Sequence, residues 1–414
     1  MTAAATRPDV ADLDLTYGEL FIRDKAHDVW QRLRAEDPVS WQDGRLWFPG
    51  FWSITKHADI LAISRDPHTF ISSKGIAMAT DPTPPPERFE ANASLITTDP
   101  PRHVRLRRLV NKGFTPRMVA LMEPGIREMT REIIANVATK GACDFVTDVA
   151  AQLPLAVICS MVGAPREDWP MLFNLTNQVL GPDDPEYQSE GRDRRETAEH
   201  GTRQMFAYFA KTVAARRREP REDMVTLLTQ AEIEGEALTE QEILAFCQLL
   251  VLAGNETTRN ATSGGLLALL EHPDELERLR ADPALMPTAV EEILRWSSPL
   301  AHMMRTATRD YELRDKVIKA GDRVMLWYPS ANRDEEVFAD PYRFDVGRTP
   351  NEHLAFGFGE HFCLGAGLAR LEIRVMFEEL LARLTDIVLA GEVERLRSTF
   401  LTGIKHMPIS FAAR

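Results

Sequence analysis

The chain has 414 residues, of which 44% are hydrophobic and 27% charged, enough for one large core or two ordinary domains. Its formal net charge of −13 argues against nucleic-acid binding, which requires a basic surface. No stretch reaches the roughly 18 apolar residues of a membrane span, and the N-terminal residues do not form a signal-peptide pattern. We therefore expect a soluble, cytoplasmic protein with no membrane span and no nucleic-acid partner.

The four cysteines exclude two further classes of protein. They stand at positions 143, 159, 247 and 363, with no C-x-x-C spacing among them. A disulfide scaffold or a structural zinc site would require closely spaced or regularly paired cysteines. The pattern is typical of a protein in a reducing compartment.

The order of elements predicts a mainly α fold with small β-sheets near both ends. Residues 39–55 contain aromatic runs broken by Gly and Pro, which predict short hairpin strands. From about residue 99 to 300 the apolar periodicity is helical, and strand signals return over 311–327. No repeat or low-complexity linker divides the chain, so we expect residues 1–414 to form a single domain.

Two stretches are poor in signals for regular structure. Residues 71–98 include a run of three prolines, and residues 181–194 are polar and rich in turn formers. Loops of this length within a compact domain are either functional lids or disordered segments. Beside a buried cofactor, lids would be the better interpretation.

A short helix is predicted after Asp99, which would cap it ahead of proline in the first turn. His103 and Arg107 are four residues apart and therefore lie on one face of that helix. The opposite face carries the basic residues Arg105, Arg108 and Lys112. On an acidic chain this face is either a docking surface for an acidic partner or an ordinary solvated helix face.

The longest predicted helix begins at Thr239, which forms a capping box with Glu242. Its centre interrupts the apolar pattern with Ala253 and the polar run that follows it. A glycine within a helix costs about 1 kcal/mol relative to alanine, and a carboxylate among apolar turns needs a partner. The centre of this helix is therefore either functional or exposed to solvent.

A third candidate is the pair Glu292 and Arg295, which are three residues apart on a predicted helix. This spacing places a carboxylate and a guanidinium on one helix face. Such pairs are common on surface helices, so the pair alone indicates little.

The most informative segment is residues 356–365, FGFGEHFCLG, in which one cysteine lies among three glycines just before a predicted helix. A thiolate at a helix N-terminus is stabilised by the helix dipole and by free backbone N–H groups. Glycines allow the backbone to approach a flat group closely. These features suit a thiolate-ligated haem, and the alternative is that Cys363 is a buried free thiol.

The segment fits F-x-x-G-x-x-x-C-x-G and resembles the cysteine loop of the cytochrome P450 family. Residues 253–257 resemble the same family's oxygen-binding turn, A/G-G-x-D/E-T. The resemblance spans essentially the whole chain. It implies the cytochrome P450 fold, with a long central helix over haem b (iron protoporphyrin IX), and Cys363 as the axial iron ligand. Phe356, the first residue of the cysteine motif, is expected beside the haem.

The resemblance also implies roles for other residues. Ala253 and Gly254 would leave space for dioxygen, while Thr257 and Glu256 would supply the protons that O–O cleavage requires. The haem propionates would be bound by His103, Arg107, Arg305 and His361. A buried structural network would hold the cysteine loop, formed by Glu292, Arg295 and Arg343.

By this resemblance the reaction is insertion of one oxygen atom of O₂ into a C–H bond, with electrons from a separate ferredoxin and its NAD(P)H-dependent reductase. The expected pocket walls are mostly apolar, which favours a lipophilic substrate; they are residues 71–98, Leu250, Ala253, 300–302, Phe400 and Leu401. His302 would either meet a polar substrate group or point to solvent. Subgroup resemblance favours sterol side chains, methyl-branched fatty acids or isoprenoids, and a terpene or a polyketide macrolide is the alternative substrate. More remote alternatives are a peroxide-driven haem-thiolate enzyme and a non-catalytic haem sensor.

Overall fold

A computed structural model describes residues 14–16, 18–44, 48–78, 94–233 and 235–414. Helices make up most of it, as expected. The α-helices are α1 (Glu19–Ile22), α2 (Ala26–Glu36), α3 (His57–Ser64), α5 (Arg102–Val110), α6 (Pro116–Ala138), α7 (Gln152–Met161), α8 (Trp169–Leu180), α9 (Arg194–Arg218), α10 (Met224–Thr229), α11 (Glu240–Glu271), α12 (Pro273–Ala281), α13 (Met286–Ser297), α14 (Tyr328–Ala331) and α15 (Ala366–Arg383). Short 3₁₀ or π turns connect several of them: η2 (Leu95–Thr97), η3 (Asn111–Phe114), η4 (Val146–Ala150), η5 (Arg166–Asp168), η6 (Pro185–Tyr187), η7 (Pro283–Leu285) and η8 (Gly359–His361).

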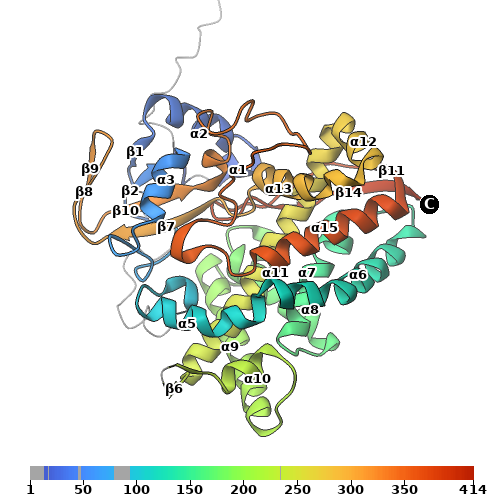
Figure 1. Ribbon diagram of the computed structural model, residues 1–414, viewed down its shortest axis with the longest axis horizontal. Coiled ribbons are helices and arrows are strands. Elements are labelled where there is room, and N and C mark those ends of the chain that lie inside the picture. Colours follow the sequence, from blue (N-terminus) through green and yellow to red (C-terminus); the bar gives the residue numbers. More distant parts are fainter. Residues whose placement is uncertain (1–13, 17, 45–47, 79–93, 234) are drawn as a thin grey trace, which may run out of the picture.

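The largest sheet joins N-terminal strands to two strands from residues 302–327. It has the order β1 (Val39–Gln42), β2 (Phe51–Ile54), β10 (Arg323–Trp327), β7 (His302–Ala307) and β3 (Phe70–Ile71). In Figure 1 the blue N-terminal strands accordingly lie beside the orange strands β7 and β10. The strands predicted within 39–55 and 311–327 are confirmed, whereas β7 lies just before the second range.

Smaller sheets lie elsewhere in the fold. One combines β11 (Leu384–Leu389), β14 (Pro408–Ala413) and β4 (Ala142–Asp144). The remaining pairs are β12 (Glu394–Arg395) with β13 (Ile404–His406), β5 (Glu232–Ile233) with β6 (Glu236–Ala237), and β8 (Tyr311–Leu313) with β9 (Lys316–Ile318).

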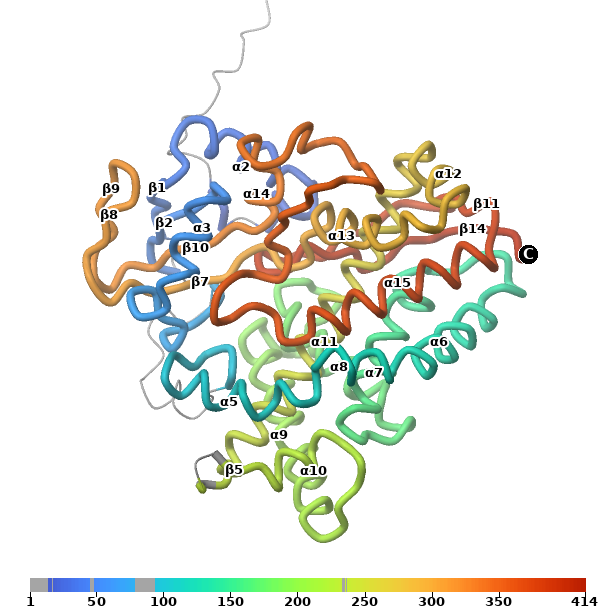
Figure 2. The backbone as a smooth tube through the Cα atoms, in the orientation of Figure 1, coloured from blue at the N-terminus to red at the C-terminus, as the bar shows by residue number. Residues whose placement is uncertain are grey.

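Helix α11 runs through the middle of the molecule and organises the core around it (Figure 2). Thr239 caps it as predicted: its hydroxyl accepts the N–H of Glu242, whose carboxylate accepts the N–H of Thr239. It packs against α7, α8, α9, α13 and α15. Such a helix is buried on most sides because it has neighbours all around it, which makes any accessible side chain near its centre informative.

Helix α5 begins later than the sequence indicates. Pro101 occupies the N-cap position, and no side chain caps the helix. The Asp99 carboxylate instead accepts the backbone N–H groups of Ser72 and Ser73, at 2.7 and 3.1 Å. The capping prediction for Asp99 is therefore wrong, because this carboxylate is engaged by a segment distant in sequence.

In the described part of the chain, no helix has the length and apolar character needed to cross a lipid bilayer.

Candidate functional site

The cysteine segment forms a closed loop before α15. The backbone N–H of Cys363 donates to the carbonyl of Phe356 at 3.0 Å, so the first residue of the motif is fastened to the cysteine. The Phe356 ring packs against Phe362, at 6.2 Å between centroids, and beneath the guanidinium of Arg370, at 4.5 Å. The loop therefore presents Cys363 on a fixed backbone, and the cysteine is exposed.

Two glycines are required by the shape of this loop. Gly357 and Gly359 have φ angles of +68° and +74°, which favour glycine because it has no Cβ. A Cβ on Gly359 would also lie 2.2 Å from the carbonyl oxygen of Ser64. Gly359 thus allows the loop to press against the end of α3.

The electrostatics of Cys363 combine opposing effects. Although Cys363 is exposed, the protein atoms packed around the loop desolvate its thiol and raise the pKa, while the N–H of Gly365 and the guanidinium groups of Arg107 and Arg370 act to lower it. The N–H contribution agrees with the expected effect of a helix start, since Gly365 is the N-cap residue of α15. Desolvation is the largest of these effects, so the pKa of the free Cys363 thiol is raised above its ordinary value.

A cationic cluster lies next to this loop. The His103 side chain on α5 is buried, and its Nδ1 is 3.3 Å from Oε2 of Glu360. One turn later, Nη1 of Arg107 donates to the Glu360 carbonyl at 3.2 Å. The prediction that these two residues share a face is therefore confirmed. The other ring nitrogen of His103, Nε2, has no hydrogen-bond partner in the described part of the chain.

Two further predicted residues join this cluster from other elements. Arg305 comes from β7 and is 7% exposed, with Nη1 donating to the carbonyl of Met304 at 2.8 Å. The His361 ring lies 4.2 Å from that of His103, and its Nε2 is 3.1 Å from the hydroxyl of Ser72. Burial, with Arg305 and His103 nearby, lowers the pKa of His361 to about 2, so this imidazole is neutral.

The cluster is suited to an anionic group. Among the described residues, neither Arg107 nor Arg305 makes an ion pair, and burial lowers the pKa of both. Arg305 is buried and Arg107 half-buried, and withdrawing a positive charge from water without an ion pair is costly; the unpaired Nε2 of buried His103 is a further open partner. An anion bound there would satisfy all of these groups, so the residues fit the propionates of a haem ligated by Cys363.

The centre of α11 presents an accessible face. Ala253 is exposed and Thr257 half-buried, although their neighbours Asn255 and Glu256 are buried. The Thr257 hydroxyl donates to the Ala253 carbonyl at 2.7 Å. Gly254 behaves differently, since a Cβ there would lie 3.1 Å from Cδ1 of Ile158. Gly254 therefore permits close packing of α7 against α11, and the structure does not turn it toward the accessible face.

The Glu256 carboxylate has almost no contact with solvent in this structure. Its side chain is 1% exposed and ion-paired with Arg259, which also donates to Oδ1 of Asn177 on α8 at 3.0 Å. Burial raises the pKa of Glu256, while Arg259 acts to lower it. The role of Glu256 in proton supply stays a prediction; the carboxylate lies within a buried pair because this face of α11 packs against other helices.

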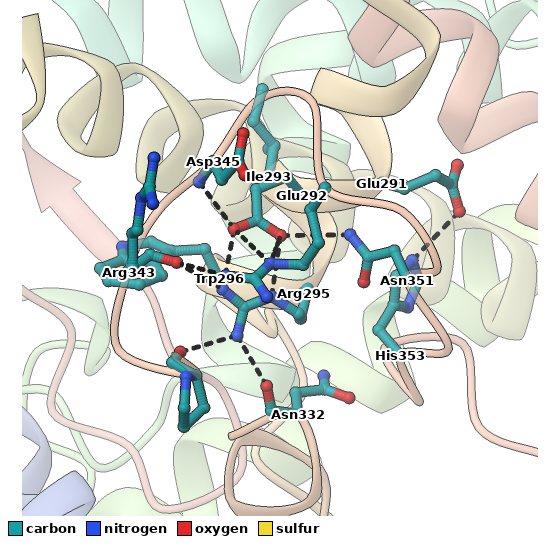
Figure 3. A network of polar contacts seen from close by, with 12 residues as sticks. Glu291, Glu292, Ile293, Arg295, Trp296, Asn332, Arg343, Asp345, Asn351 and His353 are labelled. Carbon is teal, nitrogen blue, oxygen red and sulfur yellow. Dashed lines mark hydrogen bonds and ion pairs between the residues drawn. The ribbon is translucent and has the colours of Figure 1, made fainter. Parts of the chain in front are cut away.

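The Glu292–Arg295 network is buried, as predicted. Both side chains are fully buried, and Arg295 also donates to the carbonyls of Asn332, Pro341 and Arg343, at 2.8, 2.9 and 3.2 Å (Figure 3). The side chain of Asn332 accepts the N–H of Leu354 at 2.6 Å. The pair thus supports the segment that leads into the cysteine loop.

The prediction that Arg343 is the third member of this network is wrong, because Arg348 supplies the guanidinium that reaches Glu292. Arg343 contributes only its carbonyl oxygen, while its side chain is exposed and points away from the pair in Figure 3. Nε of Arg348 donates to Glu292 at 3.2 Å, and this side chain is 10% exposed. The chain turns between these two arginines, so only the later one reaches the buried carboxylate.

Sequence reasoning missed Glu291, the residue before this pair. Its carboxylate accepts from Arg370 on α15, at 2.7 and 2.8 Å, and lies 3.1 Å from Nε2 of His353. Although burial by itself raises it, His353 and Arg370 bring the pKa of Glu291 down to about 2. The sequence does contain a signal for this second ion pair, namely two adjacent glutamates on one helix. Adjacent helical residues point in different directions, so each of the two carboxylates needs its own partner.

The basic residues of the docking prediction are exposed. Arg105 and Arg108 lie on α5, while Lys112 lies on the following turn, η3. The face opposite His103 is thus basic, although it extends over two elements instead of one helix.

The expected pocket walls are only partly described. Residues 79–93 of the 71–98 segment lie outside the described residues. Leu300 and Leu401 form an isolated bridge, which brings two of the candidate walls together. His302 is fully buried and therefore reaches neither solvent nor a substrate, contrary to both alternatives considered for it.

The 181–194 segment is fastened by Glu186 to Lys405 and His406, at 3.0 and 2.9 Å.

Comparisons with known proteins agree with these motifs. The family model described as Cytochrome P450 matches residues 156–403. A methyl-branched lipid omega-hydroxylase from Mycobacterium tuberculosis is 42% identical, with 99% of both chains covered. A steroid C26-monooxygenase from Mycobacterium bovis is 39% identical, over 92% of this chain and 88% of that protein. The solved structure of a Mycobacterium marinum cytochrome P450 in complex with pseudoionone has a TM-score of 0.90 at 36% identity, covering 99% of this chain and 100% of the other.

Proposed function

The chain belongs to the cytochrome P450 family of haem-thiolate monooxygenases, and we propose that it hydroxylates a lipophilic substrate, with methyl-branched lipids and sterol side chains favoured. The reaction inserts one oxygen atom of O₂ into a C–H bond and reduces the other to water with two electrons and two protons. We further propose that residues 1–414 form one such unit, which works in the cytoplasm.

We propose haem b as the cofactor, with the Cys363 thiolate as its axial ligand and Phe356 beside it. When bound, the haem supplies the iron at which O₂ is reduced. His103, Arg107, Arg305 and His361 would bind its propionates. The observation that carries the proposal is that an exposed cysteine on a closed loop adjoins two guanidinium groups, half-buried Arg107 and buried Arg305, that have no ion pair in the described part of the chain.

The accessible face of α11 would manage the protons. Ala253 has a side chain small enough to leave room beside it, and the Thr257 hydroxyl can donate a proton or a hydrogen bond at Oγ1. Rotation of the Thr257 side chain about χ1 would redirect this donor from the Ala253 carbonyl. Glu256 would take part only when its ion pair with Arg259 opens.

The substrate class rests on the named relatives and on the apolar character of the candidate walls. Leu250, Leu300 and Phe400 carry no polar side-chain atoms, and an apolar pocket selects for lipophilic molecules. Leu401, at 1% exposure, is nearly as buried as His302 and is not counted among these walls. Electrons would come from a ferredoxin and its NAD(P)H-dependent reductase, docked on the basic surface formed by Arg105, Arg108 and Lys112.

An optical titration of the haem-loaded ferric protein tests the proposal. The panel contains methyl-branched fatty acids, sterol-enones, small terpenes and a macrolide. We expect a saturable shift from low to high spin with the first two classes, together with a hydroxylated product when a ferredoxin, its reductase and NADH are supplied. A shift confined to terpenes or the macrolide would overturn the substrate class. Absence of a thiolate-type spectrum in the wild type, as in a Cys363→Ser control, would overturn the site.

A further inference from the structure

His302 is the first residue of β7 and lies entirely within the protein. Its imidazole packs edge-on against Trp327, at 5.0 Å between centroids, and against Phe400, at 5.4 Å. A fully buried histidine that serves only packing would leave its nitrogens unpaired at a cost. Both nitrogens of His302 are instead engaged.

The two hydrogen bonds of His302 go to backbone atoms of two distant segments. Nδ1 is 3.0 Å from the carbonyl oxygen of Thr399, which can only accept, so Nδ1 carries the proton. Nε2 is 3.3 Å from the backbone nitrogen of Met78, whose N–H donates to it. This arrangement requires the neutral imidazole, and burial lowers the pKa of His302 to about 4.

Backbone hydrogen bonds extend the same contacts along β7 and the residues just before it. On one side, the N–H of Met304 donates to the carbonyl of Ile76 at 2.7 Å. On the other, the N–H of Ala301 donates to the carbonyl of Phe400 at 2.8 Å, and the N–H of Thr402 to that of Pro299 at 3.1 Å. We call these two partners the 76–78 segment and the 399–402 turn. Each belongs to a stretch expected to face the substrate.

The His302 imidazole lies on the face of β7 opposite to the haem site. Side chains alternate between the two faces of a strand, so Met303 and Arg305 share one face while His302 and Met304 share the other. Arg305 belongs to the cationic cluster beside Cys363, whereas Met304 packs into a separate core with Trp327. His302 therefore acts on a substrate only through the segments that it holds.

We propose that His302 is a positioning residue that links the 76–78 segment to the 399–402 turn across β7, and thereby sets which C–H bond of the substrate is presented for oxidation. The consequence for the substrate rests on the proposed function, whereas the link itself does not. A single neutral ring that donates to one segment and accepts from the other keeps their separation constant, because neither bond can move without straining the other.

Amide hydrogen exchange of the haem-loaded protein tests the link directly. We expect His302→Phe, which keeps a ring and removes both nitrogens, to increase exchange in both segments at least tenfold. His302→Asn places an amide near the Nδ1 position and should loosen only the 76–78 segment. His302→Gln reaches the Nε2 position and should loosen only the 399–402 turn. The matched control is His272→Phe, because His272 also bonds one carbonyl through Nδ1 and packs between two aromatic rings, but lies at the end of α11; it should leave both segments unchanged.

Substrate assays on the same variants test the consequence. At unchanged haem content, we expect the His302 variants to alter the ratio of hydroxylated products several-fold and to weaken the spin-state titration, with little change for His272→Phe. Unchanged exchange in all three His302 variants would overturn the link. Altered exchange with an unchanged product ratio would overturn the positioning role and leave a structural one. If the wild type binds no panel lipid, the proposed substrate class fails, while the exchange result still decides whether the link exists.

Discussion

Glu292 and Arg295 face each other through two parallel hydrogen bonds of 2.8 Å, with neither side chain exposed to solvent. A two-pronged pair of this geometry is stronger and more directional than a single ionic contact. Because Arg295 also holds three carbonyls of the segment before the cysteine loop, the pair fixes backbone as well as charge.

The first prediction concerns this network. Glu292→Gln leaves the buried Arg295 charge uncompensated and should lower the free energy of unfolding by about 3–5 kcal/mol, with loss of haem. Arg348→Ala should cost less, since Nε of Arg348 lies 3.2 Å from the Glu292 carboxylate, farther than Arg295. Its other hydrogen bonds, to the carbonyls of Ala339, Asp340 and Arg343, lie on the exposed side of the network. Arg343→Ala is the matched control, because its exposed side chain should change stability by no more than about 0.5 kcal/mol. Denaturant unfolding followed at the haem absorbance measures all three, and a large loss in Arg343→Ala would contradict the assignment of Arg348.

A second prediction follows from the backbone of the cysteine loop. Gly359→Ala adds a Cβ next to the Ser64 carbonyl at a positive φ angle, so the loop must shift and haem retention should fall. Gly367→Ala is the control. It lies in α15, where a Cβ would meet only Cγ2 of Val119 at 3.9 Å, and alanine should stabilise the helix by up to about 1 kcal/mol. Haem content after gel filtration measures both, and equal retention in the two variants would contradict the packing argument.

The buried acid on α11 yields a third prediction. Arg259→Met leaves the buried Glu256 carboxylate without its ion-pair partner and should destabilise the protein by about 3–5 kcal/mol. Adding Glu256→Gln removes the unpaired charge and should restore much of that loss. The fraction of NADH electrons recovered in product should fall in both, because neither retains the ionisable pair. Failure of the double variant to recover stability would show that the pair is not the main role of Arg259.

The fourth prediction concerns pH. Burial by itself would lower the pKa of His406. Its hydrogen bonds to Asp144 and Glu186 outweigh this effect and raise the pKa above the ordinary value of 6.5. The folded state therefore binds this proton more tightly, so the stabilisation is complete below pH 6.5 and disappears as pH rises through the raised pKa. A double-mutant cycle of His406→Gln and Glu186→Gln should give a coupling of about 0.5 kcal/mol at pH 6. A coupling that stays constant up to pH 9 would rule out protonation as its origin.

The fifth prediction addresses the basic surface on α5 and η3. Arg105→Glu combined with Arg108→Glu should leave haem binding intact and slow reduction by ferredoxin steeply at low salt, with the difference shrinking as salt screens the charges. Lys211→Glu with Arg218→Glu makes the same charge change at exposed positions of α9 and serves as the control. Equal rates in the two double variants would remove the surface from consideration.

Much of the site was predictable because its signals are local. The capping box at Thr239 depends on residues three apart, and the glycines around Cys363 reflect backbone shapes that few other residues adopt. His103 and Arg107 share a face by helical geometry alone. These features identified the cysteine loop and the long helix before any packing was known, whereas the grouping of His103 and Arg107 with Arg305 and His361 followed from the family resemblance.

Other assignments depended on contacts between distant segments. Residue spacing did not reveal that Arg348 and not Arg343 reaches Glu292. Nor did it reveal the ion pair of Glu256 with Arg259, or the hydrogen bonds that Asp99 accepts from Ser72 and Ser73. In each case several chemically equivalent groups were available. Which group was used depended on how the surrounding elements pack.

By itself, then, the sequence determined the chemistry of this protein: the family motifs, the cysteine and the helices that carry them, because local backbone preferences and residue types encode these directly. Only the tertiary structure decided which guanidinium reaches a buried carboxylate, which acid is withdrawn from water, and which backbone groups His302 joins. Those outcomes depend on burial, and burial is a property of the packed chain as a whole.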